Sequence, residues 1–242
     1  MKNRRIDQAG VFRLPCLIFC ALILLVPAAV PPAQAQENPE LKKVFAQMEK
    51  VGKGFRSFTA KIAKKKYTAI LKEFDETETG EFYYGRAADG SALIREDIAA
   101  PVRRILTIKG ETATVFWPNS RQAKVLNLGK NKDKAEYLAI GIGQSPAKLQ
   151  ENYDITYQGS ESVDGSPCSV LLLRPKDQRT AAIYSLITMW VEKSTGITTQ
   201  YKLQEPNNDY LLVNFTDEKL NVRIPDSKFE QKIPSGVEIQ RF

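Results

Sequence analysis

Apolar and polar residues alternate over short runs from Arg56 to the end of the chain, with the period of a β-strand. Turn sequences separate these runs, among them Asp89-Gly90 and Asp164-Gly165. Closely spaced turns favour antiparallel pairs, because parallel strands need a crossover helix between most neighbours. The eleven predicted strands span residues 56–72, 78–86, 92–98, 103–109, 111–117, 121–127, 153–160, 168–174, 186–193, 197–205 and 210–217.

The first predicted strand changes the phase of its apolar positions. Phe58 and Ile62 occupy even positions, whereas Tyr67 and Leu71 occupy odd ones. A bulge or sharp bend near Lys64 would explain this change, and such features help a sheet to curl into a barrel.

A helix is predicted over residues 39–51, ahead of the strands. Asn38 is a suitable cap, Pro39 suits the first helical position, and the helix carries one apolar stripe that must be buried. With the strands, the helical pattern predicts a mainly β, α+β fold in which helices cover one face of a curved sheet. Three further helical intervals are predicted at residues 132–142, 145–151 and 177–184.

The first 35 residues have the pattern of an export signal. Lys2, Arg4 and Arg5 precede an apolar run over residues 14–30, and Ala33-Gln34-Ala35 provides the small residues of a cleavage site. The alternative is an uncleaved membrane anchor, since a spanning helix needs roughly twenty apolar residues. We expect a signal peptide over residues 1–35, one domain over residues 36–242, and export to the periplasm.

Removal of residues 1–35 changes the charge and cysteine content. The formal net charge falls from +7 to +4, and Cys168 is the one cysteine that remains. No intramolecular disulfide is then available, and Cys168 is interpreted as a small buried apolar residue. The basic run Lys64-Lys65-Lys66 is interpreted as a solvated strand edge, with contact to an anionic membrane surface as the alternative. Nothing in this distribution indicates nucleic-acid binding.

The chain has no histidine, which excludes Ser-His-Asp triads and most catalytic zinc sites. Ser145 and Lys148 have the spacing of a serine–lysine nucleophile pair. However, Ser145 followed by Pro146 fits a helix cap better. We therefore expect a protein that is not an enzyme and that uses no metal or cofactor.

The closing segment of the chain, residues 219–239, resembles that of the periplasmic lipoprotein carriers of the LolA type. It contains Asn221, Phe229 and the run Pro234-Ser235-Gly236-Val237 in the order typical of that family. The chain departs from the family pattern at Ala87, Lys109 and Thr114, where proline, an acidic residue and an aromatic residue are usual. Further similar stretches are residues 80–86, 94–95 with Pro101, 110–118, and 189–191 with Thr195-Gly196.

The resemblance implies an incomplete antiparallel β-barrel of about eleven strands with a helical lid. It also implies a monomeric carrier that shields lipoprotein acyl chains in an apolar cavity. Its partners would be an inner-membrane release complex and an outer-membrane acceptor. In the family, the arginine that matches Arg86 holds the lid closed by hydrogen bonding to helix backbone, so Arg86 is a candidate for this role; a solvated strand-end arginine is the alternative.

Ten strand residues are candidates for the cavity lining, and an ordinary filled core is the alternative for them. A binder of lipids or other small apolar ligands, and an envelope-associated structural protein, remain alternative functions. The candidates are Phe82, Tyr84, Ile94, Val115, Trp117, Met189, Val191, Leu211, Val213 and Phe215.

Overall fold

The computed structural model describes residues 38–129 and 137–242. The predicted export segment, and residues 132–136 of one predicted helical interval, lie outside these ranges. Among the helices in these ranges, none is both long enough and apolar enough to cross a bilayer. The helices are α1 (Pro39–Lys53), α2 (Pro146–Asn152), α3 (Gln178–Ala181) and the 3-10 helix η2 (Asp226–Phe229).

All eleven predicted strands are present, and the mainly β fold class is confirmed. The structure adds the short β2 and the final β13 to the predicted set. The strands are β1 (Ser57–Thr68), β2 (Glu73–Phe74), β3 (Glu78–Arg86), β4 (Ala92–Ala100), β5 (Arg104–Lys109), β6 (Thr112–Trp117), β7 (Gln122–Asn127), β8 (Tyr153–Val163), β9 (Ser166–Pro175), β10 (Leu186–Glu192), β11 (Thr198–Gln204), β12 (Tyr210–Leu220) and β13 (Glu238–Arg241).

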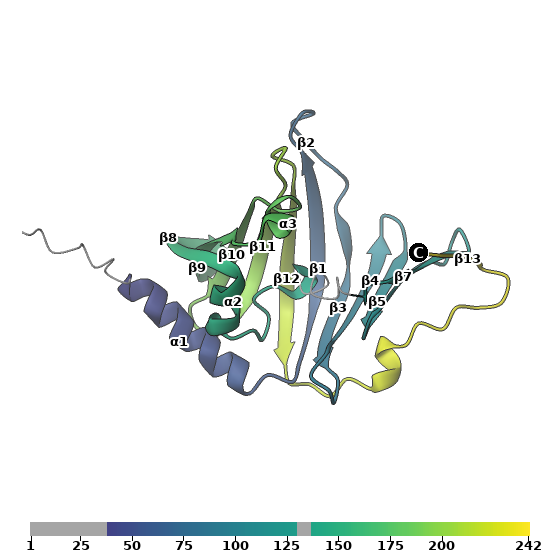
Figure 1. Ribbon diagram of the computed structural model, residues 1–242, viewed down its shortest axis with the longest axis horizontal. Helices are drawn as coiled ribbons and strands as arrows, with labels where there is room; N and C mark the ends of the chain where they lie inside the picture. Colours follow the sequence, from purple (N-terminus) through teal and green to yellow (C-terminus); the bar gives the residue numbers. More distant parts are fainter. Residues whose placement is uncertain (1–37, 130–136) are drawn as a thin grey trace, which may run out of the picture. The chain divides into compact units, whose positions relative to one another are not determined.

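The strands form one open 13-stranded sheet in the order β13-β7-β6-β5-β4-β3-β1-β12-β11-β10-β9-β8, with β2 paired to β1 (Figure 1). The sheet does not close, because β8 and β13 are its two ends. Neighbouring strands are antiparallel, as the short turns predict, except that β13 runs parallel to β7. Strands β1 and β12, which are far apart in the sequence, pair near the centre of the sheet.

Helix α1 begins where the sequence predicts and packs through one apolar stripe. The Asn38 side chain accepts a hydrogen bond from the Glu40 backbone N–H, and Pro39 occupies the first turn. Val44 and Met48 are buried in the core cluster. At Gly196, where φ is +75°, a side chain would collide with Gln47 of the helix. A glycine is therefore needed where α1 lies against the turn between β10 and β11.

The two faces of the sheet are covered by different parts of the chain. We call the face that carries Phe82 and Phe215 the inner face; α1, α2 and residues 137–144 pack against it in one core cluster. The opposite, outer face of β3 to β5 is crossed by residues 221–237, which we call the C-terminal segment. Here Lys228 pairs with Asp97 at 2.9 Å, and Phe229 is buried.

The interpretation of Lys64-Lys65-Lys66 as a strand edge is wrong. β1 is an interior strand that pairs with both β3 and β12, and Lys64 is buried on the inner face. Interior strands normally exclude charges, but here an ion pair with Glu96 makes the burial possible.

The predicted bulge near Lys64 is also absent. The register with β12 is continuous through Lys64, and the irregularity in β1 lies between Thr59 and Lys61. The apolar phase changes because Tyr67 packs on the outer face, where its ring stacks 4.8 Å from that of Tyr210.

Candidate functional site

The inner face brings most of the candidate cavity residues into one apolar surface. Strand register places Phe82 opposite Ala60, and Phe215 opposite Ile62, so that these side chains share a face. The rings of Phe82 and Phe215 lie 5.2 Å apart. Seven of the ten candidates are buried in this cluster: Phe82, Tyr84, Ile94, Met189, Val191, Val213 and Phe215.

The other three candidates lie at the flanks of this surface. Val115 and Trp117 of β6 are half-buried, and Val115 pairs with Leu106 on the same face. Leu211 of β12 is half-buried against the core. The ammonium group of Lys124 lies 5.9 Å from the Trp117 ring. The inner face therefore changes from a closed apolar centre to a partly exposed flank on β6.

Residues 137–144, which we call the lid segment, lie over the centre of the inner face. Ala139, Ile140 and Ile142 are fully buried in the core cluster, each 2% exposed or less. Gly141 has φ +77°, and a side chain there would collide with Met189. The sequence predicts a helix here, but positive φ at Gly141 and Gly143 interrupts it, and only residues 137–139 form a 3-10 turn.

Arg86 contacts the lid segment from the end of β3. Its Nη2 donates a hydrogen bond to the Gly143 carbonyl oxygen at 3.0 Å. Its guanidinium carbon lies 5.8 Å from the centre of the Phe55 ring, which is itself 5.3 Å from the Tyr84 ring. The acceptor is a loop carbonyl just before α2 rather than a carbonyl inside a helix.

Tyr201 makes a second contact with the lid segment, from β11. Its hydroxyl donates to the Leu138 carbonyl oxygen at 3.1 Å. Complete burial, and to a smaller extent the nearby charge of Glu96, raise the pKa of the Tyr201 phenol well above its ordinary value. Tyr201 and Arg86 thus hold the two ends of the lid segment by its backbone carbonyls. Nothing in the local sequence around Tyr201 distinguishes it from an ordinary core tyrosine.

A charged cluster interrupts the apolar inner face. Lys64 Nζ lies 2.8 Å from Glu96 Oε2 and 3.5 Å from Glu78 Oε2, and Arg104 Nη2 lies 2.8 Å from Glu78 Oε2. Glu96 is 1% exposed. Sequence reasoning missed this cluster, because its members come from four strands and each one is ordinary in its own run.

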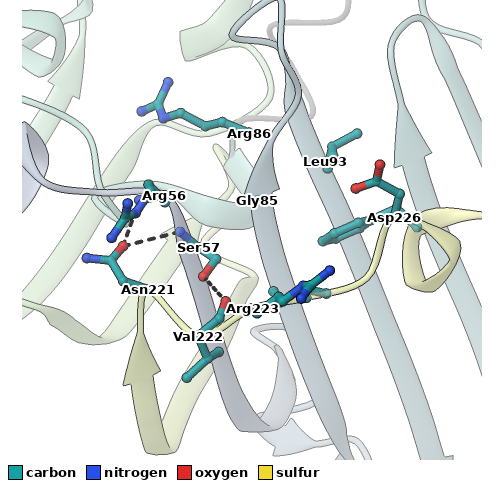
Figure 2. Close-up of a pocket in the computed structure, with 11 residues that line it drawn as sticks. Arg56, Ser57, Gly85, Arg86, Leu93, Asn221, Val222, Arg223 and Asp226 are labelled. Carbon is teal, nitrogen blue, oxygen red and sulfur yellow. Dashed lines mark hydrogen bonds between the residues drawn. The ribbon is translucent and has the colours of Figure 1, made fainter.

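A separate pocket of about 300 Å³ lies where β1 and β12 meet the C-terminal segment (Figure 2). Asn221, which has φ +57°, organises it by accepting hydrogen bonds from the Arg56 and Ser57 backbone N–H groups and donating to the Gly54 carbonyl oxygen. The arginine side chains that line the pocket do not converge on a common point in Figure 2. The full lining is Arg56, Ser57, Gly85, Arg86, Leu93, Asn221, Val222, Arg223, Ile224, Asp226 and Phe229.

The residues considered for catalysis have structural roles. The Ser145 side chain caps α2 by accepting from the Lys148 backbone N–H, as the sequence predicts. Cys168 is fully buried, and this burial raises the pKa of its thiol. Within the described ranges, no group of three or more His, Cys, Asp or Glu side chains is arranged to hold a metal ion.

Several solved structures are similar to this one. A conserved protein from Thermus thermophilus is 10% identical, with a TM-score of 0.52 over 84% of this chain and 99% of that one, and at this identity it shows the fold alone. A LolA superfamily protein from Nitrosomonas europaea is 13% identical over 78% of this chain and 97% of that one, with a TM-score of 0.36. The resemblance to LolA-type proteins is confirmed to the extent that proteins of that superfamily are among the solved structures similar to this chain.

The Pseudomonas aeruginosa MucA/MucB complex contains a chain that is 15% identical over 80% of this one, with a TM-score of 0.45. The match spans 61% of that chain's length. No curated protein sequence matches this chain significantly. A family model for the MucB/RseB N-terminal domain matches residues 96–233, which is more than half of the chain. The protein therefore belongs to the MucB/RseB N-terminal domain family.

Proposed function

We propose that the protein is a periplasmic carrier whose inner face binds the acyl chains of lipoproteins after the lid segment moves away. The main support for this proposal is that the lid segment, which is short and irregular rather than a long helix, fills the centre of the large apolar inner face. Its backbone carbonyls are held by hydrogen bonds from Arg86 and Tyr201.

The lid segment acts as an internal competitor for the acyl chain. It buries Ala139, Ile140 and Ile142 against the inner face. Burial of an acyl chain stabilises the complex by roughly 0.8 kcal/mol per methylene group, so a long chain with more carbons than these three side chains together binds the inner face more strongly than they do. When the acyl chain replaces the lid segment, the inner face stays shielded from water both with and without cargo.

The ten candidate residues have distinct places in this proposal. The buried centre, including Phe82 and Phe215, becomes the chain-binding surface once the lid segment leaves. Val115, Trp117 and Leu211 form the flanks along which the chain extends. Arg86 closes the lid. Binding of this kind needs apolar surface and no catalytic group, metal or cofactor.

Release of the cargo would follow from the same competition. The lid segment returns to the inner face when an acceptor offers the acyl chains another apolar environment. The inner-membrane release complex and the outer-membrane acceptor are proposed as the two partners. Cleavage of residues 1–35 is part of the proposal, since a shuttle must leave the inner membrane.

The test is to purify the exported protein from the periplasm and identify what it carries by native mass spectrometry. Recovery of a tri-acylated lipoprotein would support the carrier. Recovery of free lipid alone would favour the lipid-binding alternative. A protein that is empty, and that does not bind a neutral apolar fluorescent probe, would refute both.

A further inference from the structure

The charged cluster on the inner face is incompletely satisfied. Glu96 Oε2 contacts Lys64, but Glu96 Oε1 has no hydrogen-bond partner in the part of the chain that the structure describes. Arg104 Nη2 contacts Glu78, yet Arg104 Nε, also buried, has no partner within the same residues. An unpaired buried polar atom is costly, so each one requires an explanation.

The two unpaired atoms belong to the same face of neighbouring strands. Glu96 pairs with Leu106, and Ile98 with Arg104, so that Glu96 and Arg104 are diagonal neighbours on β4 and β5. Such neighbours lie about 7 Å apart at the level of the Cβ atoms. One is an acceptor and the other a donor, and neither has a partner among the described residues, so a single polar group placed between them would bond to both.

The charge of the cluster limits the kind of group that fits. Lys64 and Arg104 carry two positive charges, and Glu78 and Glu96 carry two negative ones, so the cluster is neutral. An anionic head group would approach the unpaired carboxylate oxygen of Glu96 and be repelled by it. A neutral group that joins an N–H or O–H donor to a carbonyl acceptor would satisfy both free atoms.

Apolar residues adjoin the cluster on the same face. Glu96 lies opposite Phe82 across β3 and β4, and Lys64 lies opposite Val213 across β1 and β12. A molecule bound along the inner face would therefore have its polar group at the cluster and its hydrocarbon chain on Phe82, Ile94 and Phe215.

We propose that Glu96 and Arg104 form a recognition site for a neutral amide-type head group, and that the inner face therefore selects N-acylated amphiphiles over esters and anionic lipids. This rests on the proposed function, because the lid segment must leave before the site becomes accessible. Glu96 accepts the N–H of the ligand, and Arg104 Nε donates to its carbonyl oxygen.

The experiment measures displacement of N-phenyl-1-naphthylamine from the full mature chain by three probes with the same hydrocarbon length. These are hexadecanoyl ethanolamide, its ester counterpart 2-hydroxyethyl hexadecanoate, which differs from it only in having an oxygen in place of the N–H, and hexadecyl phosphate. We expect the ethanolamide to bind about tenfold more tightly than the ester, as one added hydrogen bond to a charged group allows, and the phosphate to bind more weakly than the ester.

The variant Glu96→Gln tests the assignment of the acceptor. Its amide oxygen would stay with the Lys64 ammonium group, and its NH₂ would replace the free carboxylate oxygen, so that the ligand N–H would face a donor. The preference for the ethanolamide should fall to within about twofold, with ester binding retained. Glu81→Gln is the matched control, since Glu81 lies exposed on neighbouring β3 and its Cα pairs with Asp97 of β4.

The outcomes separate this proposal from the proposed function. Equal binding of ethanolamide and ester by the unmodified chain would overturn head-group recognition and leave acyl-chain binding intact. Tightest binding of the phosphate would overturn it in favour of an anion site. Failure of all three probes to bind would overturn both. The comparison in the unmodified chain decides the matter even if Glu96→Gln does not fold.

Discussion

Arg86 Nη2 and the Gly143 carbonyl oxygen are joined by a 3.0 Å hydrogen bond that ties the end of β3 to the lid segment. The two residues are far apart in the sequence, and Gly143 has φ +61° at a point where any side chain would collide with the Phe55 ring. The bond therefore fixes the lid where its backbone lies close against the aromatic residues of the core.

Replacement of Arg86 by leucine should weaken the closed lid. One hydrogen bond of this kind is worth about 1 kcal/mol net, so the open fraction should rise about fivefold. Because the apparent dissociation constant scales inversely with the competent fraction, the affinity for a neutral apolar probe should rise by the same factor. Fluorescence titration measures this change, and hydrogen exchange at residues 138–144 should accelerate with it.

Arg121→Leu is the matched control for that variant, because Arg121 also donates to a backbone carbonyl oxygen, that of Ser235, in the C-terminal segment. It should leave probe affinity unchanged. An Arg86→Leu protein with the affinity and exchange rates of the unmodified chain would show that Arg86 is an ordinary strand-end arginine.

Tyr201→Phe should reduce stability near neutral pH by about 1 kcal/mol, because the Leu138 carbonyl oxygen loses its donor. The pH dependence should change as well. The pKa of Tyr201 in the folded protein is raised above its ordinary value of 10.0, mainly by burial, so the folded state holds the proton more tightly than the unfolded state does. Stability from this group is full below pH 10 and is lost as the pH rises above that value.

Urea unfolding at about pH 8 and about pH 11, on either side of the ordinary phenol pKa, measures this effect. The unmodified protein should lose more stability between the two values than Tyr201→Phe does. Tyr157→Phe serves as the comparison, since the 3.0 Å hydrogen bond between the Tyr157 and Ser160 hydroxyls lies at the surface. Identical losses in the unmodified and Tyr201→Phe proteins would mean that the phenol is not held protonated by the fold.

Lys64→Met should destabilise the protein by about 3–5 kcal/mol, because it leaves the Glu96 carboxylate buried without its counter-charge. The double variant Lys64→Met, Glu96→Leu should recover most of this loss, since apolar pairs of similar volume replace buried ion pairs at little cost. Urea denaturation of the four proteins of this cycle gives the coupling energy. A double variant that is no more stable than Lys64→Met would contradict the buried pair.

Asn221→Ala should cost about 2–3 kcal/mol. The substitution removes the hydrogen bonds that join β1 and β12 to the end of α1, and it places alanine at φ +57°. In Asn221→Gly the hydrogen bonds are lost as well, but glycine adopts positive φ without strain. The stability of this variant should therefore lie between those of the unmodified protein and Asn221→Ala. Thermal unfolding ranks the three proteins, and equal stability of the glycine and alanine variants would remove the conformational contribution.

Local sequence signals predict much of this fold because they depend on residues close together in the chain. Asn38 and Pro39 define the start of α1, and the turns separate all eleven principal strands. Strand alternation also predicts that Phe82, Tyr84 and Ile94 share one face of the sheet, as the register shows. These features need only the period of the strands and the chemistry of turns.

The features that sequence reasoning missed depend on distant partners. From its local sequence, Lys64 resembles a lysine of an edge strand, because its partner Glu96 lies on another strand. β13 is only four residues long and pairs with β7, far away in the chain, so no local run identifies it. The lid segment has the apolar content of a helix, but Gly141 and Gly143 have positive φ and lie where a side chain would collide with Met189 and Phe55, respectively.

The burial of Cys168 has a practical consequence for measuring the movement of the lid segment. In a chain without residues 1–35, Cys168 is the only cysteine in the sequence; it is fully buried on β9, and its sulfur lies 3.7 Å from the Thr199 hydroxyl of β11. Thiols introduced at the surface can then be labelled without replacing a native residue. A dye pair on the lid segment and on the turn between β10 and β11 would report lid opening as a change in energy transfer in a single molecule.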